Sequence, residues 1–168
     1  SKWVGIEGTM IFAKEKEAEL KEHFPADFVD TAIGFDRYLS VVPEAAVATQ
    51  SSVAAMHDVT EGGLFGALWE MAEASGVGLE IDLKKIPIRQ ETVEICEYFD
   101  VNPYGLISSG MMLMASADGN ALVLALQEAG IPATVIGKAT EGNDRVIIRD
   151  EERRFLEPPK TDELYKVL

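Results

Sequence analysis

The sequence predicts an α/β (α+β) domain in which helices cover a β-sheet. Stretches with apolar residues at helical spacing alternate along the chain with short apolar runs of strand length. The composition supports this class, because 168 residues, 47% of them hydrophobic, are enough for one domain with a continuous core. Amphipathic helices are so numerous that we expect both faces of the sheet to be covered.

Three helices are predicted before residue 50. Apolar residues recur at helical spacing over residues 9–24, among lysines and glutamates, and Pro25 ends that pattern. A second helix is predicted over residues 26–38, because its first turns carry aspartates that favour the positive end of a helix dipole. Pro43 suits the first turn of a short third helix that extends to Ala48.

Three further helices are predicted between strands. Residues 64–75 have apolar side chains at helical spacing and are followed by Gly76, a natural left-handed cap. Another helix is predicted over residues 90–99. The last helix is predicted to begin at Asp118, whose carboxylate can accept hydrogen bonds from the first turn, and to close at Gly130.

Five strands are predicted. The clearest covers residues 77–83, where apolar and polar side chains alternate with the period of a half-exposed strand. The other four are short runs between turns, and they cover residues 53–56, 111–115, 133–139 and 145–149. We expect the run 111–115 to be a central strand. The tail after Pro159 is expected to form a short polar helix at most.

The charge of the chain argues against two classes of partner. A formal net charge of −14 would repel both a nucleic-acid backbone and an anionic bilayer. No apolar stretch approaches the roughly 20 residues of a membrane helix, and the first residues do not resemble a secretion signal. We therefore expect no nucleic-acid partner, no membrane partner and a cytoplasmic location, which suits a chain with one cysteine.

No metal site is predicted from the motifs. The sequence has neither CxxC nor HExxH, and a zinc site would require His23 and His57 to converge with carboxylates. Cys96 lies in the mixed run EICEYF, where buried packing is the simplest interpretation.

Residues 57–64, HDVTEGGL, are the most informative functional feature. They join the end of an apolar run to the start of a predicted helix, where unpaired N–H groups and the helix dipole favour an anion. Gly62 and Gly63 lack Cβ atoms, so their amides can approach an oxyanion closely. We interpret the segment as a loop that binds nucleotide phosphate.

The polar residues of this loop have candidate tasks. Thr60 can cap the helix or donate its hydroxyl to a phosphate oxygen, and Asp58 can hold a magnesium-bound water. Glu61 could point away from an anion, contact a metal or act on the substrate, and His57 could act as a base or bond a backbone carbonyl. On spacing alone, a purely architectural turn is an equally good interpretation, because this is not the Walker pattern.

The same region resembles a known family. The run MHDVTEGGLFGALWEMAEA, followed by SGVGLEIDLKKIPI, is similar to the C-terminal domain of the AIR synthase (PurM-like) superfamily. The similarity continues through residues 106–111, 135–138 and 145–148, so it covers most of the chain. The superfamily includes aminoimidazole ribonucleotide synthetase, formylglycinamidine synthase, thiamine-monophosphate kinase, selenophosphate synthetase and HypE proteins. HypE and AIR synthase-related proteins resemble this chain most.

The resemblance implies a three-layer α/β/α sandwich with a mixed sheet, partly similar to the ferredoxin-like fold, as in PurM C-terminal domains. It also implies that residues 1–168 form one domain that lacks an N-terminal ATP-binding domain. Members of this superfamily use ATP, with Mg²⁺, to phosphorylate and so activate a small acceptor. The chain alone is expected to be inactive and to require no cofactor.

The resemblance also assigns site residues, although it names no catalytic residue. The positions that match the loop facing the ATP phosphates are Asp58, Thr60, Gly62 and Gly63, and His57 and Glu61 flank them. HypE proteins end in a cysteine, whereas the last residues of this sequence are LYKVL. We therefore expect ATP-dependent activation and leave the HypE reaction open.

The candidate partners follow from this resemblance: an N-terminal domain of the same protein, a second copy of the chain, and a hydrogenase-maturation partner protein. An alternative function is a noncatalytic docking or regulatory module, whose acidic surface would bind a basic partner. A third is a small-ligand sensor built on a ferredoxin-like sheet.

Overall fold

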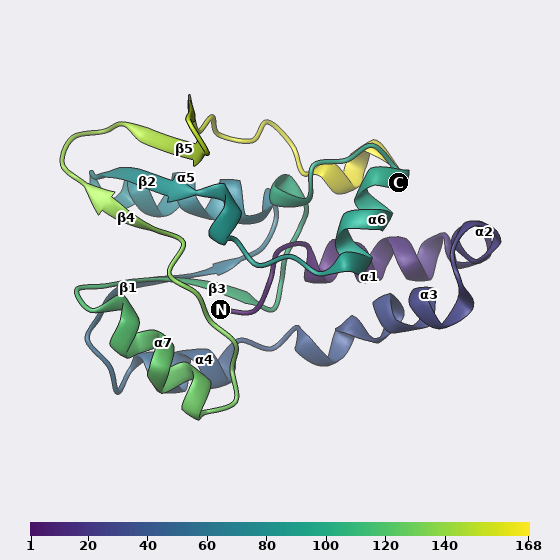
Figure 1. Cartoon of the computed structure of the whole chain (residues 1–168), viewed down its shortest axis with the longest axis horizontal. Helices are drawn as coiled ribbons and strands as arrows, with labels where there is room; N and C mark the ends of the chain where they lie inside the picture. The colour runs from purple at the N-terminus through teal and green to yellow at the C-terminus, as the bar shows by residue number, and fades with distance from the viewer.

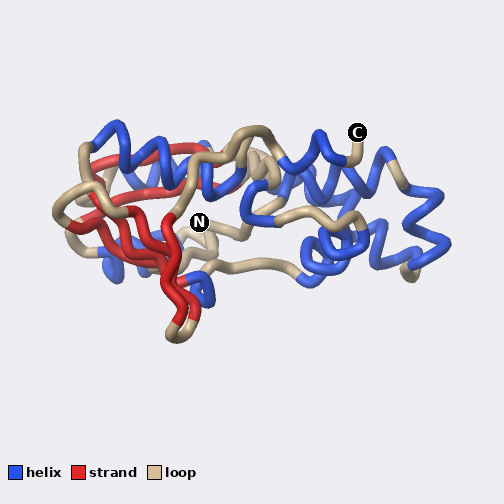
Figure 2. The backbone as a smooth tube through the Cα atoms, turned by 90° about the horizontal axis from the view of Figure 1, so that it is seen from above, coloured by secondary structure: helices blue, strands red, loops and turns tan.

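The strands of the protein lie in two sheets, and most of its helices gather at one end. A computed structural model describes all of residues 1–168. Figure 1 shows helices α1, α2, α3 and α6 at one end, which we call the helical end, and both sheets at the other, which we call the sheet end. Figure 2 shows the same division from above, with the N-terminus between the two ends.

The helices match the predicted regions closely. They are α1 Ile6–Glu15, α2 Glu17–His23, α3 Ala26–Ile33, α4 Val42–Ala48, α5 Gly63–Ser75, α6 Gln90–Tyr98 and α7 Gly119–Glu128. The helix predicted over residues 9–24 is in fact two helices, because Lys16 leaves the helical conformation with φ −115° and ψ 26°. The helix predicted over residues 26–38 continues from α3 as a tighter 3-10 turn.

Two predicted helix ends are confirmed in detail. Gly76 is left-handed, with φ of 62°, and closes α5. The carboxylate of Asp118 accepts a hydrogen bond of 3.0 Å from the N–H of Ala121, in the first turn of α7.

The six strands form one antiparallel pair and one mixed sheet. They are β1 Val53–Val59, β2 Gly78–Asp82, β3 Met111–Ser116, β4 Gly137–Thr140, β5 Arg145–Arg149 and β6 Glu152–Phe155. β1 pairs with β3, while the other four follow the order β4-β2-β5-β6, in which β2 and β5 are parallel. The α/β class and the mixed sheet are confirmed.

The prediction that residues 111–115 form a central strand was wrong. β3 pairs with β1 alone, because an apolar run indicates burial on both faces but does not indicate how many strands lie beside it. Residues 133–136 precede β4 without forming a strand, so the observed strand begins later than the predicted run 133–139. β6 was not predicted, since all of its side chains are exposed and it has no apolar alternation.

The core has two main parts. At the sheet end, α5 packs against both sheets, with Leu68 among residues of β1, β2, β3 and β5. Helix α7 packs on the opposite face of the β1–β3 pair, so both faces of that pair are covered (Figure 1).

At the helical end, α1, α3 and α6 enclose a second core that includes Cys96. Burial raises the pKa of the Cys96 thiol to about 12, in agreement with its interpretation as a packed residue. None of the helices combines the length and hydropathy needed to cross a bilayer.

Candidate functional site

The turn between β1 and α5 presents polar side chains to solvent. Alternation along β1 places Asp58 on its exposed face, and the next two polar residues, Thr60 and Glu61, are also exposed. Gly62 then reverses the chain with φ of 81° and precedes the first residue of α5. The strand-to-helix turn expected from the sequence is therefore present, with its carboxylates and hydroxyl accessible.

A carboxylate from the C-terminal segment occupies the start of α5. Asp162 accepts hydrogen bonds from the backbone N–H groups of Gly62 at 2.6 Å, Leu164 at 2.8 Å and Ile107 at 3.2 Å. We call these three N–H groups the amide cluster. Asp162 is only 2% exposed. The start of α5 thus holds an anionic oxygen, as a helix N-terminus is expected to do, but the anion belongs to the chain itself.

The sequence interpretation missed Asp162 because it lies 100 residues from Gly62 along the chain. The local signal was present, since Asp162 also caps the short 3-10 helix Glu163–Lys166. That signal indicates a helix start and does not indicate a distant partner.

The backbone itself requires glycine at both positions of the pair. Gly62 and Gly63 have positive φ, and a Cβ atom on Gly63 would lie 2.6 Å from the carbonyl oxygen of Tyr104. The N–H of Gly63 donates to the carbonyl of Thr60 at 3.0 Å. Both glycine N–H groups therefore have acceptors within the chain. This corrects the expectation of open amides, because buried backbone donors are almost always paired and sequence spacing does not reveal their acceptors.

Thr60 does not cap α5, contrary to one of its predicted tasks. The N-cap position is Gly62, and no side chain caps this helix from that position. The carbonyl of Thr60 accepts hydrogen bonds from the N–H groups of Gly63 at 3.0 Å and Ser108 at 3.4 Å, which fixes the backbone of the turn. The side chain of Thr60 remains exposed beside it.

His57 connects β1 to α5. Its Nε2 lies 3.0 Å from the carboxylate of Glu70 on α5, and its Nδ1 lies 2.6 Å from the backbone carbonyl oxygen of Asp58. The interpretation that this histidine bonds a backbone carbonyl is therefore confirmed. Both ring nitrogens have partners in the chain, so the geometry gives His57 a positioning role.

The carboxylates of the turn do not form a complete metal site. The Asp58 side chain is 64% exposed, and its Oδ1 lies 3.8 Å from Nδ1 of His57. No three histidine, cysteine or acidic side chains converge closely enough to hold a metal ion. Asp58 and Glu61 fit a hydrated Mg²⁺ only as outer contributors, with the remaining oxygen ligands supplied by a nucleotide or by another domain.

Aromatic and basic side chains flank the first turn of α5. Phe65 stacks on Tyr104, with ring centroids 5.3 Å apart, and the guanidinium of Arg154 lies 5.8 Å from the Phe65 ring centroid. Burial raises the pKa of Tyr104 above its usual value, so its hydroxyl stays neutral. Sequence reasoning missed this cation because β6, which carries Arg154, was not predicted.

The comparison with known families identifies the chain. The family model described as AIR synthase related protein, C-terminal domain, matches residues 2–150. The chain belongs to this family. Among curated proteins, a putative hydrogenase expression/formation protein of Methanocaldococcus jannaschii is 37% identical over 118 residues, which are 67% of this chain and 35% of that protein. The carbamoyl dehydratase HypE of Rhodobacter capsulatus is 32% identical over 97 residues, or 55% of this chain and 28% of that protein.

Two solved structures match nearly the whole chain. A crystal structure of E. coli HypE has a TM-score of 0.75 at 20% identity and covers 99% of this chain. A HypE structure in complex with ATP has a TM-score of 0.71 at 19% identity and covers 97% of this chain. These likenesses confirm the fold, and this chain spans 51% and 50% of those two proteins.

Proposed function

We propose that this AIR synthase-related chain is the C-terminal domain of an ATP-dependent enzyme that phosphorylates, and so activates, a small acceptor. In this proposal an N-terminal domain of the same protein supplies most of the nucleotide site, and the β1–α5 turn faces the phosphates. The phosphate-facing residues are Asp58, Thr60, Gly62 and Gly63, with His57 and Glu61 flanking them. ATP and Mg²⁺ are the nucleotide and metal of the whole enzyme.

The observation that carries the proposal is the amide cluster at the start of α5. Three backbone N–H groups converge there on one carboxylate, so the local field favours negative charge even though the chain as a whole carries a net charge of −14. Arg154 adds a cation beside the same helical turn. A phosphate oxygen has the same acceptor chemistry as the carboxylate of Asp162.

The exposed side chains of the turn give a phosphate group direct contacts. The hydroxyl of Thr60 can donate to a phosphate oxygen, and the carboxylate of Asp58 can accept from a water bound to Mg²⁺. Gly62 can donate its N–H only after Asp162 withdraws, because one N–H cannot serve both acceptors well. The loop therefore has an outer polar contact, which is open, and an inner backbone contact, which Asp162 holds.

A role in hydrogenase maturation is the finer part of the proposal. It rests on the related proteins from M. jannaschii and R. capsulatus and on the HypE structures, one of which contains HypE together with HypF. By this analogy the maturation partner would be a HypF-like protein, and a homodimer is the other candidate assembly.

Nucleotide binding by the protein that contains both domains tests the proposal. The change Thr60→Val removes an exposed hydroxyl while keeping the size of the side chain. We expect it to weaken binding of a nonhydrolysable ATP analogue with Mg²⁺ by about fivefold, as for the loss of one hydrogen bond of about 1 kcal/mol. Isothermal titration calorimetry would measure the difference.

The matched control is Thr31→Val, which removes a hydroxyl from α3 at the helical end. This control should leave nucleotide affinity unchanged. Equal affinities for wild type, Thr60→Val and Asp58→Asn would contradict a phosphate-facing turn. Gly62→Val and Gly63→Val are unsuitable, because the backbone requires glycine at both positions.

One observation favours the alternative of a noncatalytic docking or regulatory module. The N–H groups of Gly62 and Gly63 are both bonded within the chain, as a purely architectural turn would require. This alternative predicts that the two-domain protein binds a partner protein with an affinity that does not change when nucleotide and Mg²⁺ are added.

A further inference from the structure

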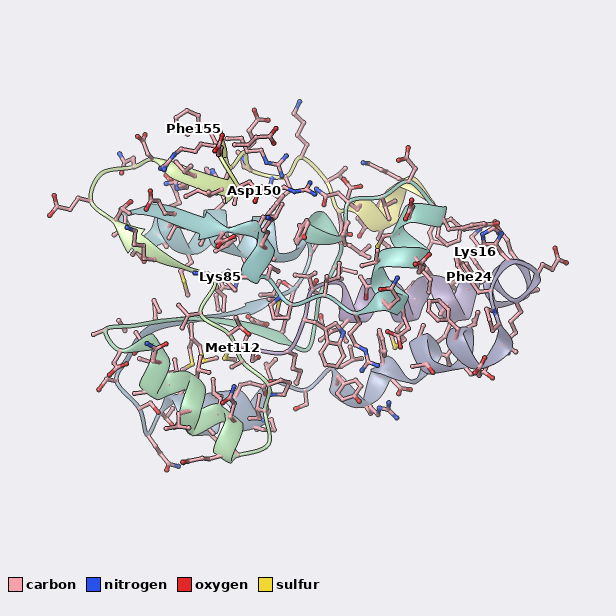
Figure 3. All side chains as sticks on the ribbon, in the orientation of Figure 1. Lys16, Phe24, Lys85, Met112, Asp150 and Phe155 are labelled. Atoms are coloured by element: carbon pink, nitrogen blue, oxygen red, sulfur yellow. The ribbon has the colours of Figure 1, made fainter.

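Five aromatic side chains form a partly exposed surface at the helical end. His23 and Phe24 come from the C-terminal end of α2, Phe28 from α3, and Tyr98 and Phe99 from the C-terminal end of α6. We call these five residues the aromatic patch, and Figure 3 labels Phe24 within it. Figure 1 shows α2 and α3 at the end of the molecule opposite β4. The patch therefore lies away from both sheets.

The rings of the patch form a continuous series from the core to the surface. Phe12 is fully buried, and its ring centroid lies 5.1 Å from that of Phe99, which in turn lies 4.9 Å from the ring of Tyr98. The Tyr98 ring is 4.8 Å from His23 and 5.9 Å from Phe24. His23 is exposed, and Tyr98 is 37% exposed. The outer rings are thus held against inner ones while they remain accessible to a partner.

The helices that carry the patch are strongly acidic. Together α2, α3 and α6 have eight acidic side chains and a single lysine. Three of these carboxylates pair with cations, since Glu17 and Asp30 contact Lys21 and Glu91 contacts Arg89. The other five have no cation within 4.0 Å, and they are Glu19, Glu22, Asp27, Glu94 and Glu97. This surface therefore holds negative charge that the chain itself does not neutralise.

Two of the unpaired carboxylates act directly on the patch. The hydroxyl of Tyr98 donates a hydrogen bond of 3.0 Å to the carboxylate of Glu19. That bond, together with burial and the charges of Glu19 and Glu22, raises the pKa of Tyr98, so its hydroxyl stays neutral. The exposed edge of the patch therefore combines aromatic rings with a negative local field.

Rings beside free carboxylates are suited to bind a cation. The face of an aromatic ring attracts an arginine or lysine side chain, and a guanidinium also donates paired hydrogen bonds to carboxylates. A purely apolar partner would bury the carboxylates without a counterion, which is costly. A second copy of the chain would bring the same carboxylates and repel. The complementary partner is therefore basic, with apolar side chains between its charges.

We propose that the aromatic patch is a docking surface for a basic amphipathic segment of a partner protein. An arginine of that segment lies over Tyr98 and His23 and donates to the carboxylates of Glu19 and Glu22. Apolar side chains of the same segment cover Phe24. This goes beyond the proposed function, because the partner binds at the helical end and the nucleotide-facing turn belongs to β1 and α5.

Synthetic peptides of defined composition test the proposal. The probe is a helical peptide with leucines on one face and arginines on the other, and two matched peptides carry lysine or glutamate in place of every arginine. We expect the arginine peptide to bind this protein about threefold more tightly than the lysine peptide, because a guanidinium stacks better on aromatic rings. The glutamate peptide should not bind. Isothermal titration calorimetry measures all three.

A substitution in the patch separates ring contacts from net charge. Tyr98→Leu removes the ring but keeps an apolar side chain, and it should weaken binding of the arginine peptide by about fivefold. The matched control is Phe155→Leu, which removes an exposed ring from β6 at the sheet end and should leave the affinity unchanged. Thermal unfolding shows that each variant is folded.

A pair of charge changes tests the carboxylates without altering the rings. Glu19→Gln combined with Glu22→Gln should weaken binding of the arginine peptide by about tenfold at low ionic strength. The matched control combines Glu128→Gln and Glu141→Gln, which are exposed at the sheet end and change the net charge equally. This control should lower the affinity much less.

Equal losses in the patch variants and their controls would overturn the proposal, because the attraction would then come from the net charge of −14 as a whole. Failure of the arginine peptide to bind would also overturn it. So would a dimer, detected by sedimentation, that Tyr98→Leu dissociates, since a second copy would then cover the patch. None of these measurements involves nucleotide, so failure here is distinguishable from failure of the proposed function, which Thr60→Val tests.

Discussion

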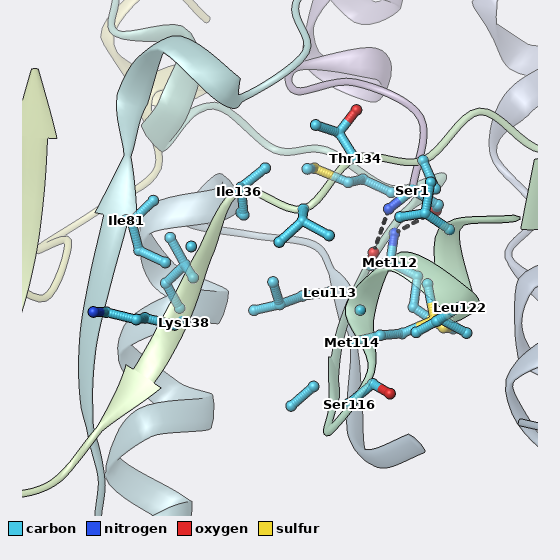
Figure 4. Close-up of a pocket in the computed structure, with 18 of the residues that line it drawn as sticks. Ser1, Ile81, Met112, Leu113, Met114, Ser116, Leu122, Thr134, Ile136 and Lys138 are labelled. Atoms are coloured by element: carbon cyan, nitrogen blue, oxygen red, sulfur yellow. Dashed lines mark hydrogen bonds between the residues drawn. The ribbon is translucent and has the colours of Figure 1, made fainter. Parts of the chain in front are cut away.

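The helical end and the sheet end of the molecule are stabilised in different ways. At the helical end, α1, α3 and α6 enclose side chains such as Phe12 and Ile95 that are fully buried, and each helix bonds its own backbone. At the sheet end, a cavity of about 400 Å³ lies between β3 and β4 (Figure 4), and Met112, labelled in Figure 3, is one of its lining residues. The edges of β3 and β4 that border this cavity have no strand beside them, so the sheet end has less backbone pairing across its centre than the helical end has within its helices.

The largest expected difference between the two ends is the cost of truncating a core side chain. Phe12 is fully buried and its ring centroid lies 5.1 Å from that of Phe99, so Phe12→Ala should lower the free energy of unfolding by about 3–5 kcal/mol. Met114 borders the cavity, and Met114→Ala should cost roughly 1 kcal/mol because neighbours are missing on one side. Urea denaturation measures both, and equal costs would remove the contrast between the ends.

A buried ion pair lies at the junction between the ends. The ammonium of Lys2 lies 2.8 Å from the carboxylate of Glu44, whose side chain is fully buried, and it also donates to the carbonyls of Tyr38, Ser40 and Gly110. Glu44→Ala leaves this cation without its counterion and should cost about 3 kcal/mol. Thermal unfolding would show it as a lower Tm. An unchanged Tm would mean that the pair does not hold the ends together.

The hydrogen bonds from the amide cluster to Asp162 should make the next largest contribution to the free energy of unfolding. Asp162→Ala removes the acceptor of three backbone N–H groups and should cost about 1–3 kcal/mol. Asp162→Asn retains one acceptor oxygen and should cost less. Chemical denaturation of both variants measures the difference. If Asp162→Ala left the free energy of unfolding unchanged, the carboxylate would not be what holds the C-terminal segment on α5.

The smallest expected effect concerns the contact between His57 and Glu70. Nε2 of His57 and the carboxylate of Glu70 are 3.0 Å apart, but the Glu70 side chain is 62% exposed, so solvent screens the interaction. Glu70→Gln should change the free energy of unfolding by less than about 0.5 kcal/mol, measured in the same denaturation experiment. A cost above about 2 kcal/mol would show that β1 depends on this contact for its position on α5.

The two ends also differ in how well the sequence predicts them. Helices at the helical end carry their signals locally: Pro25 ends one helical segment, and the apolar spacing of residues 90–99 locates α6. At the sheet end, β5 was predicted with its observed bounds, because apolar runs between turns are also local signals. Strand partnership is not local, which explains why the division into two sheets was not foreseen.

The candidate site shows the same limit. The turn, its exposed Asp58 and Thr60, and the start of α5 all follow from a short stretch of sequence. The carboxylate of Asp162 and the guanidinium of Arg154 reach this turn from the last part of the chain, through contacts that only the folded structure brings together. Local chemistry was therefore predictable, and the partners that satisfy it were not.

The most direct test of the phosphate-facing turn is the backbone amide resonance of Gly62 in the two-domain protein, followed by NMR as an ATP analogue and Mg²⁺ are added. We predict a large shift of the Gly62 resonance that saturates with nucleotide binding, as a phosphate oxygen replaces the carboxylate of Asp162. A protein that binds the nucleotide while the resonances of Gly62, Gly63 and Thr60 stay unchanged would contradict the proposed role of this turn.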